Sequence, residues 1–160
     1  MTLQLSTASF EDAGLGAHST RTDDGQVLSV LFDQLQIDSA QADVDAVPQV
    51  RRAEGVVHCE GSGWVSVQVR GATAAAGGHG YAHVTGWANG RRLLPAAHAP
   101  DEPFVTAVAA PVGRDGRLRL SLLLLAQRDL GSTDSAAACW VDSIDITVLP
   151  DAQSRAGTST

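Results

Sequence analysis

The sequence of 160 residues contains no lysine and has only two cysteines, one methionine and one tyrosine. All eleven basic residues are therefore arginines, and with eighteen acidic residues the formal net charge is −7. This charge opposes a phosphate backbone, and no segment combines clustered basic residues with aromatic ones, so no nucleic-acid partner is expected. The longest apolar run, Leu122 to Ala126, is far too short to cross a bilayer, so no membrane partner is expected.

Cysteine is too scarce for a disulfide framework. Cys59 and Cys139 could close a single loop or remain as two buried thiols, and we expect free thiols because no secretory signal precedes the chain. The start, Met1 to Ser6, lacks the basic residues and the apolar stretch of such a signal. The chain as written is therefore expected to be cytoplasmic, or exported if a leader has been removed.

Apolar residues at every second position are the main structural signal. Leucine occupies alternate positions of 118–124, and one face of 139–148 is shared by Trp140, Ile144, Ile146 and Val148. This period of two is typical of half-buried strands. The chain shows no convincing helical periodicity, so the fold is predicted to be all-β.

Strands are predicted at 26–37, 50–58, 63–70, 81–88, 91–94, 104–112, 117–127 and 139–148. The strand at 26–37 is apolar on both faces and should lie centrally or be covered on both sides. Asn89-Gly90 predicts a type I′ hairpin, because both positions need positive φ, and Gly113 to Gly116 predicts a second hairpin. About eight or nine such strands indicate an antiparallel β-sandwich or jelly roll, with a small β-barrel as the alternative.

The chain is expected to form one domain. Residues 1–24 are polar and turn-rich and should be an N-terminal arm or an edge strand. Residues 25–149 should form the single β domain, and 150–160, which begin at Pro150, should be a disordered tail.

Two consecutive strands repeat an unusual arrangement of faces, in which small apolar residues occupy one face and aromatic and hydrogen-bonding residues the other. The aromatic and hydrogen-bonding residues are Trp64, Gln68, Arg70, Tyr81, His83, Thr85 and Trp87. Consecutive strands are neighbours about two-thirds of the time, which would join these faces into one patch. Such a patch is typical of small-molecule or sugar sites. The alternative is that these are solvent-side residues of an antiparallel sheet.

Three functional hypotheses follow from this pattern. The first is a non-enzymatic binding module that holds a carbohydrate or another amphipathic small molecule on these seven residues, without a cofactor. The second is a small intracellular β-barrel enzyme of cyclase or isomerase type, which encloses an apolar substrate and uses His83 or Tyr81 as acid or base. The third is a structural or assembly subunit that forms a homo-oligomer through an exposed edge strand.

A metal site is not expected. His79 and His83 are about 13 Å apart along a regular strand, which is too far to share one zinc ion. Ligation would need a bulge at Gly80 that turns the chain. It would also need a further ligand from His58, Cys59 or His98.

A resemblance to known proteins is carried by three segments, which are 22–33, Arg51-Arg52 ahead of Cys59, and 118–122 leading to Asp142-Ser143. Together they resemble a family of small exported β-sandwich proteins of uncharacterised function. The closing segment 140–148 is similar to the last strand of jelly-roll carbohydrate-binding modules. The resemblance implies a sandwich or jelly roll, and it assigns no catalytic residue.

Overall fold

The computed structural model describes residues 3–11, 13–38, 49–75, 81–93, 102–127 and 137–150. In order across the sheet, sheet A contains β1 (Gln4–Phe10), β5 (Gln49–Glu60), β10 (Arg117–Gln127), β7 (Tyr81–Ala88) and β8 (Arg91–Leu93). Sheet B contains β2 (Ala17–Arg21), β3 (Val27–Phe32), β11 (Ala137–Val148), β6 (Trp64–Ala75) and β9 (Glu102–Pro111), with β4 (Gln36–Asp38) also paired to β11. A short 3-10 helix, η1 (Ala13–Leu15), lies between β1 and β2.

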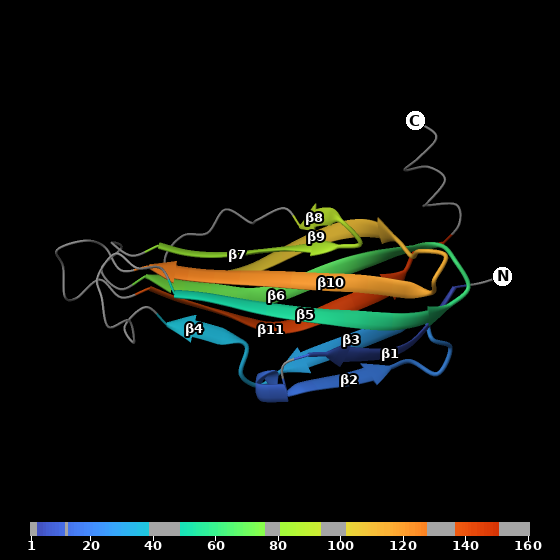
Figure 1. Cartoon of the computed structure of the whole chain (residues 1–160), viewed down its shortest axis with the longest axis horizontal. Coiled ribbons are helices and arrows are strands. Elements are labelled where there is room, and N and C mark those ends of the chain that lie inside the picture. The colour runs from blue at the N-terminus through green and yellow to red at the C-terminus, as the bar shows by residue number, and fades with distance from the viewer. Residues whose placement is uncertain are drawn as a thin grey trace.

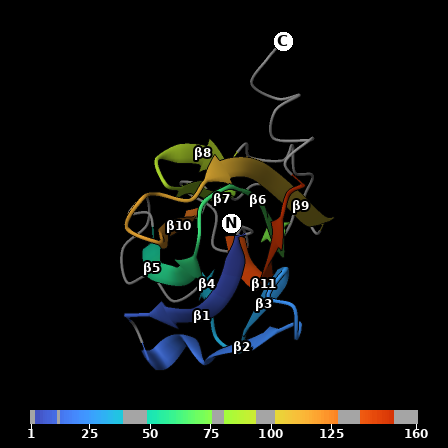
Figure 2. The same ribbon diagram turned by 90° about the vertical axis from the view of Figure 1, so that its right-hand side faces the viewer.

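The two sheets pack face to face (Figure 1), and the view along the strands shows them as two layers (Figure 2). Every strand pair in the described residues is antiparallel, so the fold is a β-sandwich, as predicted. Along the two sides of the sandwich, β1 lies beside β2 and β8 lies beside β9. None of the described residues form a helix that could cross a membrane.

The core lies between the inner faces of the two sheets. Alternate leucines of β10, from Leu118 to Leu124, and alternate valines of β6, from Val65 to Val69, are almost fully buried there. Burial of each such side chain contributes about 1.5–3 kcal/mol to the stability of the fold, relative to leaving it exposed. Phe10 of β1 meets Phe32 of β3 edge to face, with ring centroids 5.1 Å apart, and so joins the two sheets near one side.

The first 38 residues hold more strands than the sequence predicted. Residues 1–24, expected to be an arm or an edge strand, supply β1 at the edge of sheet A and β2 at the edge of sheet B. The strand predicted at 26–37 is divided into β3 and β4 by a bend at 33–34. β3 lies between β2 and β11, but its outer face is open, since Leu31 is 55% exposed. The described residues therefore form eleven strands rather than the predicted eight or nine. Residues 151–160 of the expected tail lie outside the described residues.

A β-bulge in β11 changes which residues face the core. The pairing of β11 with β6 shifts between Val141 and Ser143, and Asp142 is left exposed. The extra residue reverses the alternation, so Val141 faces the core before the bulge and Ile144 faces it afterwards. Trp140, predicted to share the buried face with Ile144, is therefore only partly buried, and that prediction was wrong.

The two cysteines are free and lie at opposite ends of the sandwich. Cys59 adjoins His58, which pairs with Arg117 at the start of β10. The Sγ atom of Cys139 lies 3.6 Å from the carbonyl oxygen of Leu125, near the end of β10. Most of the length of β10 separates the two thiols, about 27 Å along a regular strand. A disulfide between them is sterically impossible, which confirms the expectation of free thiols.

Thiol burial predicts a loss of stability at high pH. Burial raises the pKa of Cys59 and of Cys139 to about 11, from an ordinary value of 9.0. Between these values the folded protein keeps both protons while the unfolded chain releases them, so the free energy of unfolding falls as the pH rises. We expect a lower urea midpoint at about pH 10 than at about pH 8, and a smaller difference in a Cys59→Ala, Cys139→Ala variant. If Ellman's reagent labels the thiols of the native protein as fast as those of the protein unfolded in urea, the thiols are not buried and the prediction is wrong.

Candidate functional site

The predicted aromatic and polar face is divided between the two sheets. β6 belongs to sheet B and β7 to sheet A, and the two strands are not neighbours although they follow each other in the chain. Val65 and Val84, which alternate with the predicted site residues, are both buried in the core. The described side chains of the predicted residues on the two strands therefore point outward on opposite sides of the sandwich. The expected single patch is wrong, and a lumen lined by it is not formed by the described residues.

On the outer face of sheet B, the predicted residues interact with other protein groups. The guanidinium of Arg91 stacks over the ring of Trp64, 4.5 Å from its centroid. Arg70 donates a hydrogen bond to Oε1 of Gln68 (3.1 Å) and forms an ion pair with Asp145 (3.5 Å). These groups are therefore already engaged with one another on this side of the molecule.

On the outer face of sheet A lie His83, Thr85 and Trp87. The hydroxyl of Thr85 is buried and has no hydrogen-bond partner in the part of the chain that the structure describes. The pKa of His83 is lowered, mainly by burial and further by the positive charge of Arg92, so its imidazole is neutral near neutral pH. Trp87 is half-buried. Of Tyr81 only the backbone is described, in register with the end of β10.

Trp87 lines an open groove of about 540 Å³ on the outer face of sheet A. The groove extends across β7, β10, β5 and β1, which are adjacent strands of the sheet. The outward-facing side chains that line it include Ser9, Glu54, Val56, Trp87, Arg119 and Ser121. The groove therefore stands on paired strands, and loops contribute only its rim.

The strand register gives the order of the residues along the groove. Ser121 pairs with Trp87 on one side and with Glu54 on the other. Because adjacent strands are about 4.8 Å apart, Trp87 and Glu54 are about 10 Å apart, with the small Ser121 between them. Gly55 and Leu120 also line the groove, and because their own side-chain positions face the core, they present backbone to it. Along the groove, an aromatic residue and a carboxylate therefore lie on either side of a serine, with exposed backbone between them.

Arg119 lies beside this row and is held in place by a neighbouring carboxylate. Its Nη2 atom lies 2.8 Å from Oδ2 of Asp115. The hydrogen bond from Arg119 is the largest cause that lowers the pKa of Asp115, so the carboxylate stays ionised at neutral pH. Asp115 engages one nitrogen of a guanidinium that carries five N–H donors, which leaves the others for a further partner.

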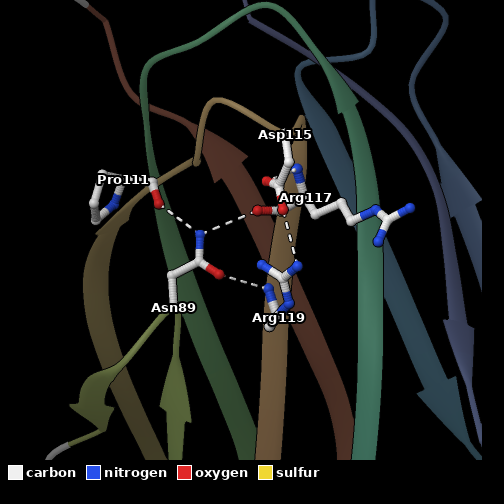
Figure 3. A network of polar contacts seen from close by, with 5 residues as sticks. All are labelled: Asn89, Pro111, Asp115, Arg117 and Arg119. Carbon is white, nitrogen blue, oxygen red and sulfur yellow. Dashed lines mark hydrogen bonds and ion pairs between the residues drawn. The ribbon is translucent and has the colours of Figure 1, made fainter.

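Asn89 links the end of β7 to the neighbouring strands (Figure 3). Its φ is 46° and that of the following glycine is 80°, as predicted for a type I′ turn. Its Nδ2 group donates to the carbonyl oxygens of Pro111 (2.7 Å) and Arg117 (3.1 Å), and its Oδ1 atom accepts from the backbone N–H of Arg119 (2.7 Å). These bonds hold Trp87, two residues earlier, in position relative to Arg119.

Sequence reasoning did not assign Ser9, Glu54, Arg119 or Ser121 to a site. These residues alternate with apolar ones, which indicates that they face outward. The same is true of every polar strand residue, so the alternation does not single them out. No local signal joins β1, β5 and β10 to β7, because these strands are neighbours only through tertiary pairing. Trp87 was identified because it shares one face of strand 81–88 with other aromatic and hydrogen-bonding residues.

Within the described ranges, no three histidine, cysteine or acidic side chains are placed to hold a metal ion. His58 is exposed on β5. His79 and His98, which the sequence analysis considered as ligands, lie outside the described residues.

No family model matches the chain, and no curated protein matches it in sequence. Among solved structures, the carbohydrate-binding module CBM36, in complex with calcium and xylotriose, matches with 14% sequence identity and a TM-score of 0.32. The match covers 71% of this chain and 100% of that chain. A likeness at this level carries no argument about ligands, so the functional proposal depends on the groove itself.

Proposed function

We propose that this protein is a non-enzymatic β-sandwich module that binds a carbohydrate in the groove of sheet A. The observation that supports the proposal is the open groove of about 540 Å³ in which Trp87 stands opposite Glu54 across Ser121. This volume is within the range of about 300–1,000 Å³ that is typical of small-ligand sites.

The chemistry of the walls suits a sugar ring, which has apolar C–H faces and a rim of hydroxyl groups. The indole of Trp87 offers a flat apolar surface to one face of the ring. Glu54 and Ser121 offer hydrogen-bonding groups to the rim, and bonds to an ionised carboxylate are about twice as strong as neutral ones. Trp87 and Glu54 are two strand spacings, about 10 Å, apart along the groove, which leaves room for one ring stacked on the indole with its hydroxyls toward the carboxylate.

The groove is built to be rigid before a ligand arrives. Its walls stand on adjacent strands that pair along most of their length. Asn89 further ties the β7 end of the groove to β10. A preformed site loses little conformational entropy on binding, so more of the contact energy is available as affinity.

Of the seven residues predicted from the sequence, the proposal uses Trp87; Thr85 and His83 are on the same strand but are not among the residues that line the groove. The three predicted residues on β6 lie on the other sheet and take no part.

Replacing Trp87 tests the proposal, with Trp64→Ala as the matched control on the opposite face. We expect isothermal titration calorimetry with soluble xylo-, cello- and chito-oligosaccharides to detect binding by the wild-type protein. Trp87→Ala should weaken it at least about tenfold, which is about 1.4 kcal/mol. Trp64→Ala should leave the affinity unchanged. The proposal fails if the wild type binds none of the series, or if Trp87→Ala lowers only the melting temperature.

A further inference from the structure

We infer that the groove is one part of a longer trough that holds an internal segment of a neutral, linear glycan, rather than a single sugar or a chain end. This inference rests on the proposed function. A second, more open hollow of about 420 Å³ is lined by Asn89, Gly90, Pro111, Gly113 and Arg119. Gly90 and Arg119 line both hollows, so the two are continuous.

The trough is longer than one sugar ring requires. It crosses four adjacent strands of sheet A, from β1 to β7, and three strand spacings of about 4.8 Å give a length of about 14 Å. The second hollow extends it further, toward the connection between β9 and β10. At the other end β1 is the edge strand, so no strand of sheet A closes the trough there.

Among the described residues, the space next to Gly90 is open where the two hollows meet. Gly90 lies at the junction and has no side chain. Even an added Cβ at this position would meet no atom within 4 Å. A chain that stacks one ring on Trp87 can therefore continue past Gly90 into the second hollow.

Arg119 is placed to bind the chain as it passes between the hollows. Its guanidinium lines both of them and is oriented by Asp115 at 2.8 Å. Its backbone N–H is held by Oδ1 of Asn89 at 2.7 Å. We therefore assign Arg119 as a binding residue and Asp115 as the residue that positions it.

The charges of the trough favour a neutral chain over an acidic one. Glu11 and Glu54 line the first hollow, and neither forms an ion pair with another described residue. The one arginine of the trough, Arg119, is already paired with Asp115. A uronic acid chain would bring its carboxylates toward Glu11 and Glu54, and like charges in a binding site oppose association.

The inference predicts an affinity that depends on chain length. In calorimetric titrations with cello- and xylo-oligosaccharides from disaccharide to hexasaccharide, we expect affinity to rise at least about tenfold and then level off. Arg119→Gln should remove most of this gain. Asp115→Asn should lose part of the gain. Arg114→Gln, in the same turn and exposed, is the matched control and should keep all of it.

The melting temperatures of all three variants should match that of the wild type, because exposed ion pairs contribute little to stability. Equal affinity for the disaccharide and the hexasaccharide would overturn the inference and leave the proposed function standing. If the protein binds none of the cello- or xylo-oligosaccharides, both the inference and the proposed function are overturned. An oligogalacturonate that binds as tightly as the neutral chain of equal length would overturn the neutral specificity.

Discussion

Replacing Gly71 by alanine is expected to prevent stable folding. A Cβ atom on Gly71 would overlap the carbonyl oxygen of Trp140 and lie 2.8 Å from Cζ of Phe104. Neither group can retreat easily, because Trp140 pairs with Gln36 and Ala72 on its two sides, and Phe104 is buried. Overpacking usually costs about 1–3 kcal/mol, and we expect more than about 4 kcal/mol where the clash is with backbone. This is a large part of the roughly 5–15 kcal/mol that stabilises a domain.

Thermal unfolding followed by circular dichroism measures this effect. We expect the melting temperature of Gly71→Ala to fall by more than about 10 °C, or the variant to be insoluble. Gly90→Ala is the matched control, because its φ is 80° but an added Cβ meets nothing within 4 Å, so it should cost only about 1 kcal/mol. If both variants melt at similar temperatures, the close approach of β6 to the bulged strand β11 is refuted.

Replacing Asn89 by alanine is expected to cost about 4–5 kcal/mol of stability. The side chain forms three hydrogen bonds, and their loss leaves the carbonyl oxygens of Pro111 and Arg117 and the N–H of Arg119 without these partners. Each bond contributes about 1 kcal/mol. Alanine must also adopt a φ of 46°, which costs about 1–2 kcal/mol for a residue with a Cβ.

Urea denaturation of three variants separates these contributions. Asn89→Gly removes the hydrogen bonds but accepts positive φ, so it should be about 1 kcal/mol more stable than Asn89→Ala. Asn89→Asp keeps the acceptor for the N–H of Arg119 and should also be more stable than Asn89→Ala. Equal free energies of unfolding for Asn89→Ala and the wild type would show that the hydrogen bonds of Asn89 in Figure 3 do not contribute to stability.

The elements that were predicted well are those whose pattern is local. β10 has the predicted bounds of 117–127, because leucine at alternate positions needs only one buried face to produce a strand. The type I′ hairpin joins β7 and β8 as predicted. A turn is also present at 113–116, but it connects β9 and β10, which belong to different sheets, so the second predicted hairpin is wrong. Asn89 has the positive φ of a type I′ turn, and the N–H of Gly116 donates to the carbonyl oxygen of Gly113.

The elements that were predicted badly depend on distant partners. The bulge at Asp142 is an irregularity in the pairing of β11 with β6, and the alternation of β11 alone did not reveal it. The bend that separates β3 from β4 places the two segments on different parts of the same strand, β11. Neither feature has a marker as strong as glycine or proline in its own segment.

The sequence by itself determined that the chain is all-β, which residues of most strands face outward, and that Trp87 stands beside a tight turn. These properties follow from a side-chain period of two and from the φ preferences of a few residues, which act over short stretches of chain. Only the tertiary structure decided that β6 and β7 belong to different sheets, so that Trp64 and Trp87 face opposite sides. It also brought Glu54, Ser121 and Trp87 into one row. Strand order depends on how all the inner faces pack together. The alternation of apolar residues shows which face of a strand is buried, but it does not show which strand lies beside it.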